Sequence, residues 1–74
     1  MSEMQIMDPT GHTSVTWDPD NRDEVATARA TYDEMTAKGY RAFRVDRRGN
    51  QSEQIRTFDP RAEEMILVPQ LRGG

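Results

Sequence analysis

The 74-residue sequence contains no cysteine and only one histidine, His12. Without cysteine the chain cannot form a disulfide, a thiolate metal site or a cysteine nucleophile. One histidine offers too few ligands for a metal site, and we expect neither a metal nor a cofactor. The longest apolar run, residues 65–68, is far too short to span a membrane. The first residues lack the basic and apolar regions of a signal peptide, so we expect a cytoplasmic protein that does not bind membranes.

Charged residues make up 31% of the chain, and their signs alternate to a formal net charge of −3. This pattern is typical of a solvated globular surface and argues against nucleic-acid binding. Hydrophobic residues reach only 34%, but they recur with helix and strand periods, which indicates a folded chain. We expect one monomeric domain, residues 1–69, followed by a short flexible tail, residues 70–74.

The first part of the chain predicts a β-hairpin. Residues 4–8 and 13–17 are short strand-like segments, and the second alternates with β-branched and aromatic residues on one face. The segment between them contains Pro9, which suits the first central position of a tight turn, and Gly11, which can adopt the positive φ of a hairpin bulge.

A helix over residues 25–38 follows the hairpin, because these are mostly good helix formers with apolar residues on one face. The sequence allows two positions for the start of this helix. Asn21 has capping-box spacing to Glu24, and Asp18 precedes a proline that could occupy the first helical position. The acidic residues at this end fit helix capping better than a calcium loop, which needs a central Gly and a downstream Glu. Gly39 ends the helix.

The second half predicts three more segments of regular structure. Residues 40–46 and 53–58 are predicted strands, and residues 61–64 are predicted to form a single helical or 3₁₀ turn. Residues 65–68 are continuously apolar, as in a central strand that is buried on both faces or that has one face at a binding surface. Pro69 cannot donate to a strand ladder and should end this strand.

These elements predict an α+β fold: a mixed sheet of four to five strands packed on one helix, in the order β-β-α-β-β-turn-β. The last strand can lie parallel to the first in the middle of the sheet. In residues 40–46 we expect Phe43 and Val45 to face the core and Ala42 to face away. The predicted core comprises Ile6, Val15, Trp17, Val25, Ala28, Tyr32, Met35, Phe43, Val45, Ile55, Phe58 and Leu67.

The sequence closes with Leu71-Arg72-Gly73-Gly74. Neither glycine has a Cβ, so a carboxylate on Gly74 would be unhindered and mobile. A partner enzyme could thread it into a narrow channel and activate it with ATP. With Gly at about 7% of residues, two final glycines arise by chance roughly once in 200 sequences, so the rest of the chain must support a functional interpretation.

The element order and three short motifs resemble the ubiquitin-like β-grasp family. Residues 4–6, Met-Gln-Ile, are similar to the opening of ubiquitin, residues 10–13 to its first turn, and residues 71–74 to its conjugating end. The resemblance covers nearly the whole chain at the level of element order. The middle of the chain departs from eukaryotic ubiquitin, which favours a prokaryotic member of the family.

This resemblance implies a protein modifier that is not itself an enzyme. An adenylating, ThiF-like activating enzyme would adenylate the Gly74 carboxylate and pass it to a cysteine as a thioester. A conjugating enzyme would then transfer it to the lysine amine of a target protein. Gly73 and Gly74 would fit a narrow channel. Arg72 and Leu71 would be read by the activating enzyme, or by a deconjugating protease, for which a metal-dependent enzyme is one candidate.

Ubiquitin is recognised through an apolar patch on its sheet, and the resemblance suggests an equivalent here. With Leu67 in the core, Ile66 and Val68 would lie beside Ala42. They would form an exposed docking patch or pack beneath a loop. Lys38 is the only lysine, so lysine-linked chains could form only there, with the N-terminal amine as the other acceptor. A cation also suits a helix end, and we expect mostly single attachment.

Two other functions fit the same sequence. A sulfur carrier of the β-grasp type also ends in Gly-Gly and is adenylated, but it carries sulfur as a C-terminal thiocarboxylate. Arg72 favours the modifier over this alternative. A small α+β binding module, in which the two glycines are incidental, is the third interpretation.

Overall fold

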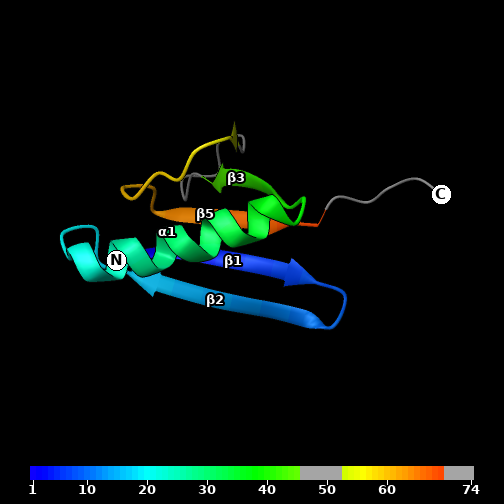
Figure 1. Ribbon diagram of the computed structural model, residues 1–74, viewed down its shortest axis with the longest axis horizontal. Helices are drawn as coiled ribbons and strands as arrows, with labels where there is room; N and C mark the ends of the chain where they lie inside the picture. Colours follow the sequence, from blue (N-terminus) through cyan, green and yellow to red (C-terminus); the bar gives the residue numbers. More distant parts are fainter. Residues whose placement is uncertain (46–52, 70–74) are drawn as a thin grey trace.

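The structure is a computed structural model that describes residues 1–45 and 53–69. Within these residues one helix packs on a five-stranded mixed sheet in the spatial order β2-β1-β5-β3-β4 (Figure 1). The elements are β1 (Ser2–Asp8), β2 (Gly11–Trp17), α1 (Arg22–Ala37), β3 (Arg41–Val45), β4 (Glu53–Ile55) and β5 (Glu64–Val68). The predicted α+β class and element order are therefore confirmed.

The β1–β2 hairpin closes through a two-residue loop, because Asp8 pairs with Gly11 in the antiparallel register. The Asp8 carboxylate accepts hydrogen bonds from the Thr10 backbone N–H at 2.7 Å and from its hydroxyl at 2.5 Å. These bonds lower the pKa of Asp8 below its ordinary value, and the bond from the Thr10 hydroxyl contributes most. Gly11 has φ +143°, a backbone angle that favours glycine, as the turn chemistry predicts.

Helix α1 begins after Asn21, so the first of the two predicted starts is confirmed. The Asn21 side chain accepts from the backbone N–H groups of Asp23 and Glu24 at 3.0 and 3.2 Å. Glu24 reaches back to the backbone N–H of Asp18 at 3.0 Å. Glu24 also accepts from the side-chain amide of Asn21 at 3.0 Å, and Asp18 accepts from the backbone N–H of Asp20 at 2.9 Å, so the acidic residues support the cap, in agreement with the capping interpretation.

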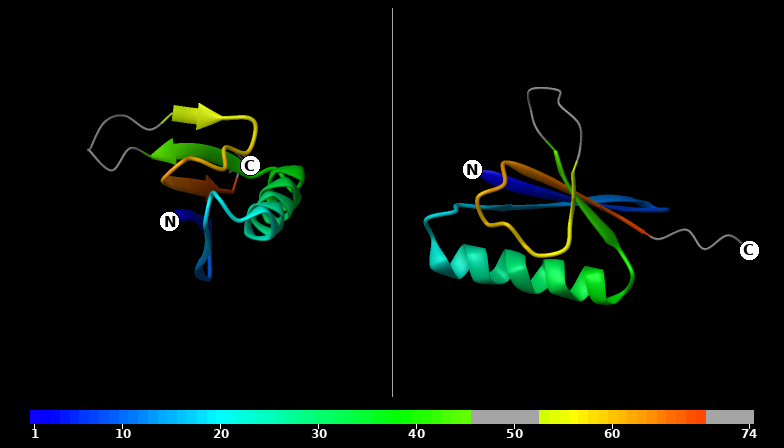
Figure 2. Two further views of the ribbon diagram at one scale, coloured as in Figure 1. Left: turned by 90° about the vertical axis from the view of Figure 1, so that its left-hand side faces the viewer. Right: turned by 90° about the horizontal axis from the view of Figure 1, so that it is seen from above.

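β5 occupies the middle of the sheet, parallel to β1 and antiparallel to β3. Figure 2 shows α1 lying against one face of the sheet, and no described element covers the other face. An N-terminal hairpin, a helix across one face and a final central strand parallel to the first define a β-grasp-like fold. The described part of the chain ends just after this central strand, at Pro69.

The core lies between the sheet and α1 and agrees with the prediction for most residues. Four predicted members are only partly buried and pack against it: Val15, Val25, Met35 and Ile55. The fully or nearly buried apolar residues are Met4, Ile6, Trp17, Ala28, Tyr32, Ala42, Phe58, Ala62, Met65 and Leu67.

The prediction for the two faces of β3 is wrong. Ala42 is 2% exposed and pairs with the fully buried Leu67, whereas Phe43 pairs with Ile66 on the opposite face. Phe43 and Val45 therefore lie outside the core. β3 carries apolar residues on both of its faces, and a shift of one residue in register exchanges the two faces. Only the pairing with β5 decides between them.

The connection from β4 to β5 contains the single turn that was predicted, but the turn lies earlier in the sequence. It covers residues 59–62 rather than 61–64 and is closed by a hydrogen bond from Ala62 N–H to Asp59 C=O at 3.2 Å, the i→i+3 spacing of a 3₁₀ turn. β5 already begins at Glu64, so this residue cannot belong to the turn. Ala62 is buried and completes the core at this end.

Aromatic rings anchor this connection to the core. Phe58 packs between Trp17 and Tyr32, with ring centroids 5.2 and 5.6 Å away. The indole N–H of Trp17 donates to the carbonyl of Pro60 at 2.9 Å. A buried indole N–H needs a partner, so this bond both satisfies Trp17 and fixes the position of the turn.

Candidate functional site

The predicted conjugation residues follow directly on the central strand. Val68 ends β5, opposite Arg41 at the start of β3, and the partly buried Pro69 follows it. Pro69 ends the strand as predicted. The conjugation tail itself, residues 70–74, lies outside the described residues. What the structure provides is its point of departure, at the end of the sheet that also holds the β1–β2 hairpin loop (Figure 1).

An apolar patch lies on the sheet face opposite α1. Its centre is the cross-strand pair of Ile66 and Phe43, and Val68 lies two residues further along β5 on the same face. Each of the three is partly buried, and no described helix or loop crosses this face (Figure 2). We call Phe43, Ile66 and Val68 the open-face patch. Cross-strand neighbours shield part of each side chain, and the remainder is accessible to a partner.

Ala42 does not belong to this patch, and its predicted place there is wrong. It lies on the core face, as described above, because its partner in the register is Leu67. Phe43 takes the place that the sequence prediction gave to Ala42. The patch is therefore larger and more aromatic than predicted, since a phenylalanine replaces a single methyl group. The only signal that could have revealed Phe43 is the β3–β5 register, which is not encoded locally.

Lys38 caps the C-terminal end of α1. Its side chain is 60% exposed, and the amine lies 3.6 Å from the Glu34 carboxylate one turn earlier. An exposed pair of this kind holds a side chain weakly. The only lysine in the chain is thus sterically accessible as an acceptor amine, and it sits on the helix rather than on the open-face patch.

In the part of the chain that the structure describes, no group of three or more histidine or acidic side chains could hold a metal ion. His12 lies on β2, opposite Met7, and is exposed, rather than in the turn where the sequence placed it. Tyr32 is the unusual titratable group. Its hydroxyl is buried without a hydrogen-bond partner among the described residues, and burial raises its pKa above the ordinary value of 10.0.

Comparison with known proteins gives no match to a family model, to a curated protein or to a solved structure. The class that can be stated is therefore the one the topology defines: a β-grasp-like domain with an open sheet face. No helix among the described residues is both long and apolar enough to cross a membrane.

Proposed function

We propose that this protein is a ubiquitin-like modifier whose Gly74 carboxylate is activated and joined to amines of target proteins. The observation that carries the proposal is the combination of a β-grasp-like fold with the sequence Leu71-Arg72-Gly73-Gly74, placed two residues after Pro69. The fold supplies a rigid body, and the central strand leads straight to the reactive end. Five residues span at most about 18 Å when fully extended, enough to enter an enzyme channel while the domain stays outside.

The chemistry would be supplied by partners. The Gly74 carboxylate attacks the α-phosphate of ATP and releases pyrophosphate. A cysteine thiolate of the activating enzyme then displaces AMP to form a thioester, and a lysine amine of the target displaces the thiolate to form an isopeptide bond. Arg72, as a cation next to the glycines, suits recognition by a carboxylate of the activating enzyme or the deconjugating protease. We propose that the modifier meets these partners in the cytoplasm.

The open-face patch supports the same proposal. Val68 belongs to both the patch and the last position of β5, one residue before Pro69. An enzyme that docks on Phe43 and Ile66 would hold the domain beside its own active site and receive the tail directly. Partly exposed apolar side chains on a polar domain are the usual basis for such docking.

Attachment in single copies is expected, because Lys38 is the only lysine. A chain of modifiers would have to grow from Lys38 or from the N-terminal amine. The Lys38 amine is accessible, so chains linked there are the alternative that a test should include. Lys38→Arg keeps the charge at the helix end and removes the acceptor.

The proposal is tested in lysate from cells that carry the gene. Tagged protein is incubated with ATP, and the products are separated with and without a reducing agent. The proposal predicts one adduct that reducing agent cleaves, the thioester, and others that resist it, the isopeptide products. Both classes should vanish without ATP and in a variant that lacks Gly73 and Gly74. The open-face variant Ile66→Asp should reduce both classes, while the core remains intact by circular dichroism.

A second measurement separates the modifier from the alternative functions. The intact mass of the protein purified from its own cells measures whether Gly74 carries the free carboxylate. A mass gain equal to exchange of one oxygen for sulfur would identify a sulfur carrier. No adduct, no mass gain and full function without Gly73 and Gly74 would leave a binding module.

A further inference from the structure

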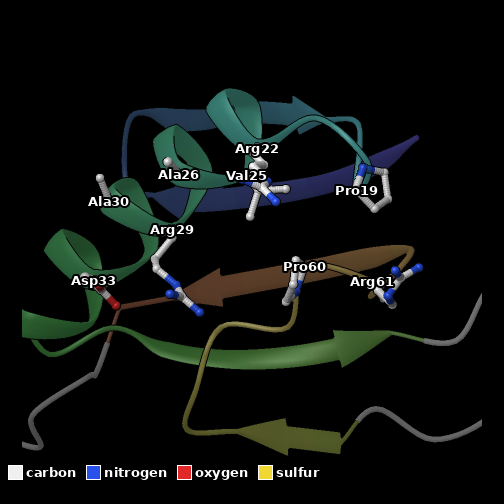
Figure 3. A pocket seen from close by; sticks show the side chains of 9 residues that line it. All are labelled: Pro19, Arg22, Val25, Ala26, Arg29, Ala30, Asp33, Pro60 and Arg61. Carbon is white, nitrogen blue, oxygen red and sulfur yellow. The ribbon is translucent and has the colours of Figure 1, made fainter.

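A groove of about 530 Å³ runs along the side of α1 away from the open-face patch. One wall is the helix, and the other is the turn that carries Pro60 and Arg61 (Figure 3). Val25 and Pro60 are partly buried within it. The groove is thus a second surface, built from elements that the proposed conjugation site does not use.

The helix side of the groove is shallow because small residues line it. Ala26 and Ala30 line the groove and are exposed, and their single methyl groups leave space above the helix backbone. Arg22 and Arg29 lie about two turns apart on the same side of the helix, since residues separated by seven positions share a helix face. Small apolar side chains therefore form the floor, and long cationic side chains stand at its edges.

The second wall is held in place by the core. The Pro60 carbonyl accepts the Trp17 indole N–H at 2.9 Å, and Trp17 is fully buried. The backbone N–H of Arg61 donates to the Asp59 carboxylate at 3.0 Å, and that carboxylate also pairs with Arg44 at 3.4 Å. A ligand would not have to order this wall on binding, so the entropic cost of binding is reduced.

The charge of the groove is opposite to that of the molecule. The chain has a formal net charge of −3, but three arginines and one acid, Asp33, line the groove. Arg22, Arg29 and Arg61 make no ion pair within the described residues. The Arg29 guanidinium stands 6.0 Å from the centre of the Phe58 ring, a contact that orients it without neutralising it.

We infer that this groove binds an acidic peptide segment of a partner protein. One apolar side chain of the peptide rests on Val25 and Pro60, and carboxylates on either side pair with the three arginines, which favour bidentate contact with carboxylates. A nucleic acid fits less well. A polyanion would extend beyond the groove over a surface of net negative charge, and the apolar floor would remain unused.

The test uses a synthetic peptide of four aspartates around one central leucine, titrated into the isotope-labelled protein at low salt. We expect amide shift changes at Val25, Ala26 and Arg61, and binding that weakens as salt is added. Arg29→Glu should lower the affinity for the peptide by about tenfold or more, since reversal of the charge turns attraction into repulsion. The matched control is Arg56→Glu, which reverses an exposed arginine outside the groove and should leave binding unchanged.

Four outcomes would overturn the inference: equal binding by the Arg29→Glu variant, equal binding of a peptide with lysines in place of the aspartates, shift changes confined to the open-face patch, or tighter binding of a single-stranded oligothymidylate. Arg61→Gln provides a second variant on the opposite wall, should Arg29→Glu perturb the helix. A peptide with serine in place of leucine should bind more weakly, because the apolar floor then has no partner. Since the tail takes no part, deletion of Gly73 and Gly74 should leave peptide binding unchanged, so this test is independent of the proposed modifier function.

Discussion

Successive residues of β5 point to opposite faces of the sheet, one toward the core and one toward the open face. Truncation of two neighbouring residues, Leu67 and Val68, tests which residue faces the core. Leu67→Ala removes three carbons from a side chain that is 0% exposed. At about 0.8 kcal/mol per methylene, the transfer free energy alone is about 2.4 kcal/mol, and the cavity left in the central strand raises the loss to about 3–4 kcal/mol. Val68→Ala removes two carbons from a partly buried side chain on the open face. Solvent can fill the space, so we expect a loss of only about 1 kcal/mol.

Urea denaturation followed by tryptophan fluorescence measures both losses, because Trp17 is the only tryptophan and is fully buried. A 74-residue domain has a free energy of unfolding of roughly 4–11 kcal/mol, so Val68→Ala should still fold, and Leu67→Ala should fold when the wild type lies above the lower end of this range. With a slope of about 1 kcal/mol per molar urea, the midpoint should fall by about 3–4 M for Leu67→Ala and about 1 M for Val68→Ala. Equal midpoints for the two variants would refute the reasoning, since β5 would then be covered on both faces and the open-face patch would not exist.

Three further predictions concern individual residues. Asn21→Ala should lower the free energy of unfolding by about 1 kcal/mol in the same urea assay, because two helix N–H groups lose their acceptor; no change would contradict a stabilising role of this cap. Tyr32→Phe should leave that free energy unchanged or raise it by up to about 1 kcal/mol, because the buried hydroxyl has no partner among the described residues. The pKa of Tyr32 is raised, so its neutral form is favoured on folding. The wild type should lose stability as pH rises from 10.0 through the higher folded pKa, and Tyr32→Phe should lose less; thermal melts in alkaline buffers compare the two. Ala42→Leu should destabilise by about 1–3 kcal/mol through overpacking, whereas a neutral result would place Ala42 on the open face.

Much of the fold could be predicted because local chemistry specifies it. Asn21 and Gly39 flank the helix, Gly11 marks the hairpin, and Pro69 ends β5, each through a backbone preference that acts within a few residues. The parity of β3 could not be predicted in the same way. Ala42 and Phe43 are both apolar, and side-chain size favours Phe43 for the core. Pairing with β5, twenty-odd residues away, overrides that preference.

The candidate site likewise contains one feature that the sequence predicts and others that depend on the fold. The Leu71-Arg72-Gly73-Gly74 end is a sequence feature and could be named without a structure. The open-face patch required the register, which replaced Ala42 by Phe43 beside Ile66. The arginine groove was not predictable at all, because it depends on the Trp17 contact that places the Pro60 turn next to the helix. No pattern in the sequence links residues so far apart.

The central claim is that Gly74 becomes covalently attached to lysines of other proteins, and the tryptic remnant tests it most directly. Trypsin cuts after Arg72, so each modified lysine keeps a Gly-Gly remnant. Peptides are compared by mass spectrometry between cells that express the wild-type chain, cells that express a chain without Gly73 and Gly74, and cells without the gene. The account predicts remnant-bearing lysines on several proteins in the first cells, with none of these sites modified in the other two. An identical set of modified sites in all three, or none in any, would contradict it.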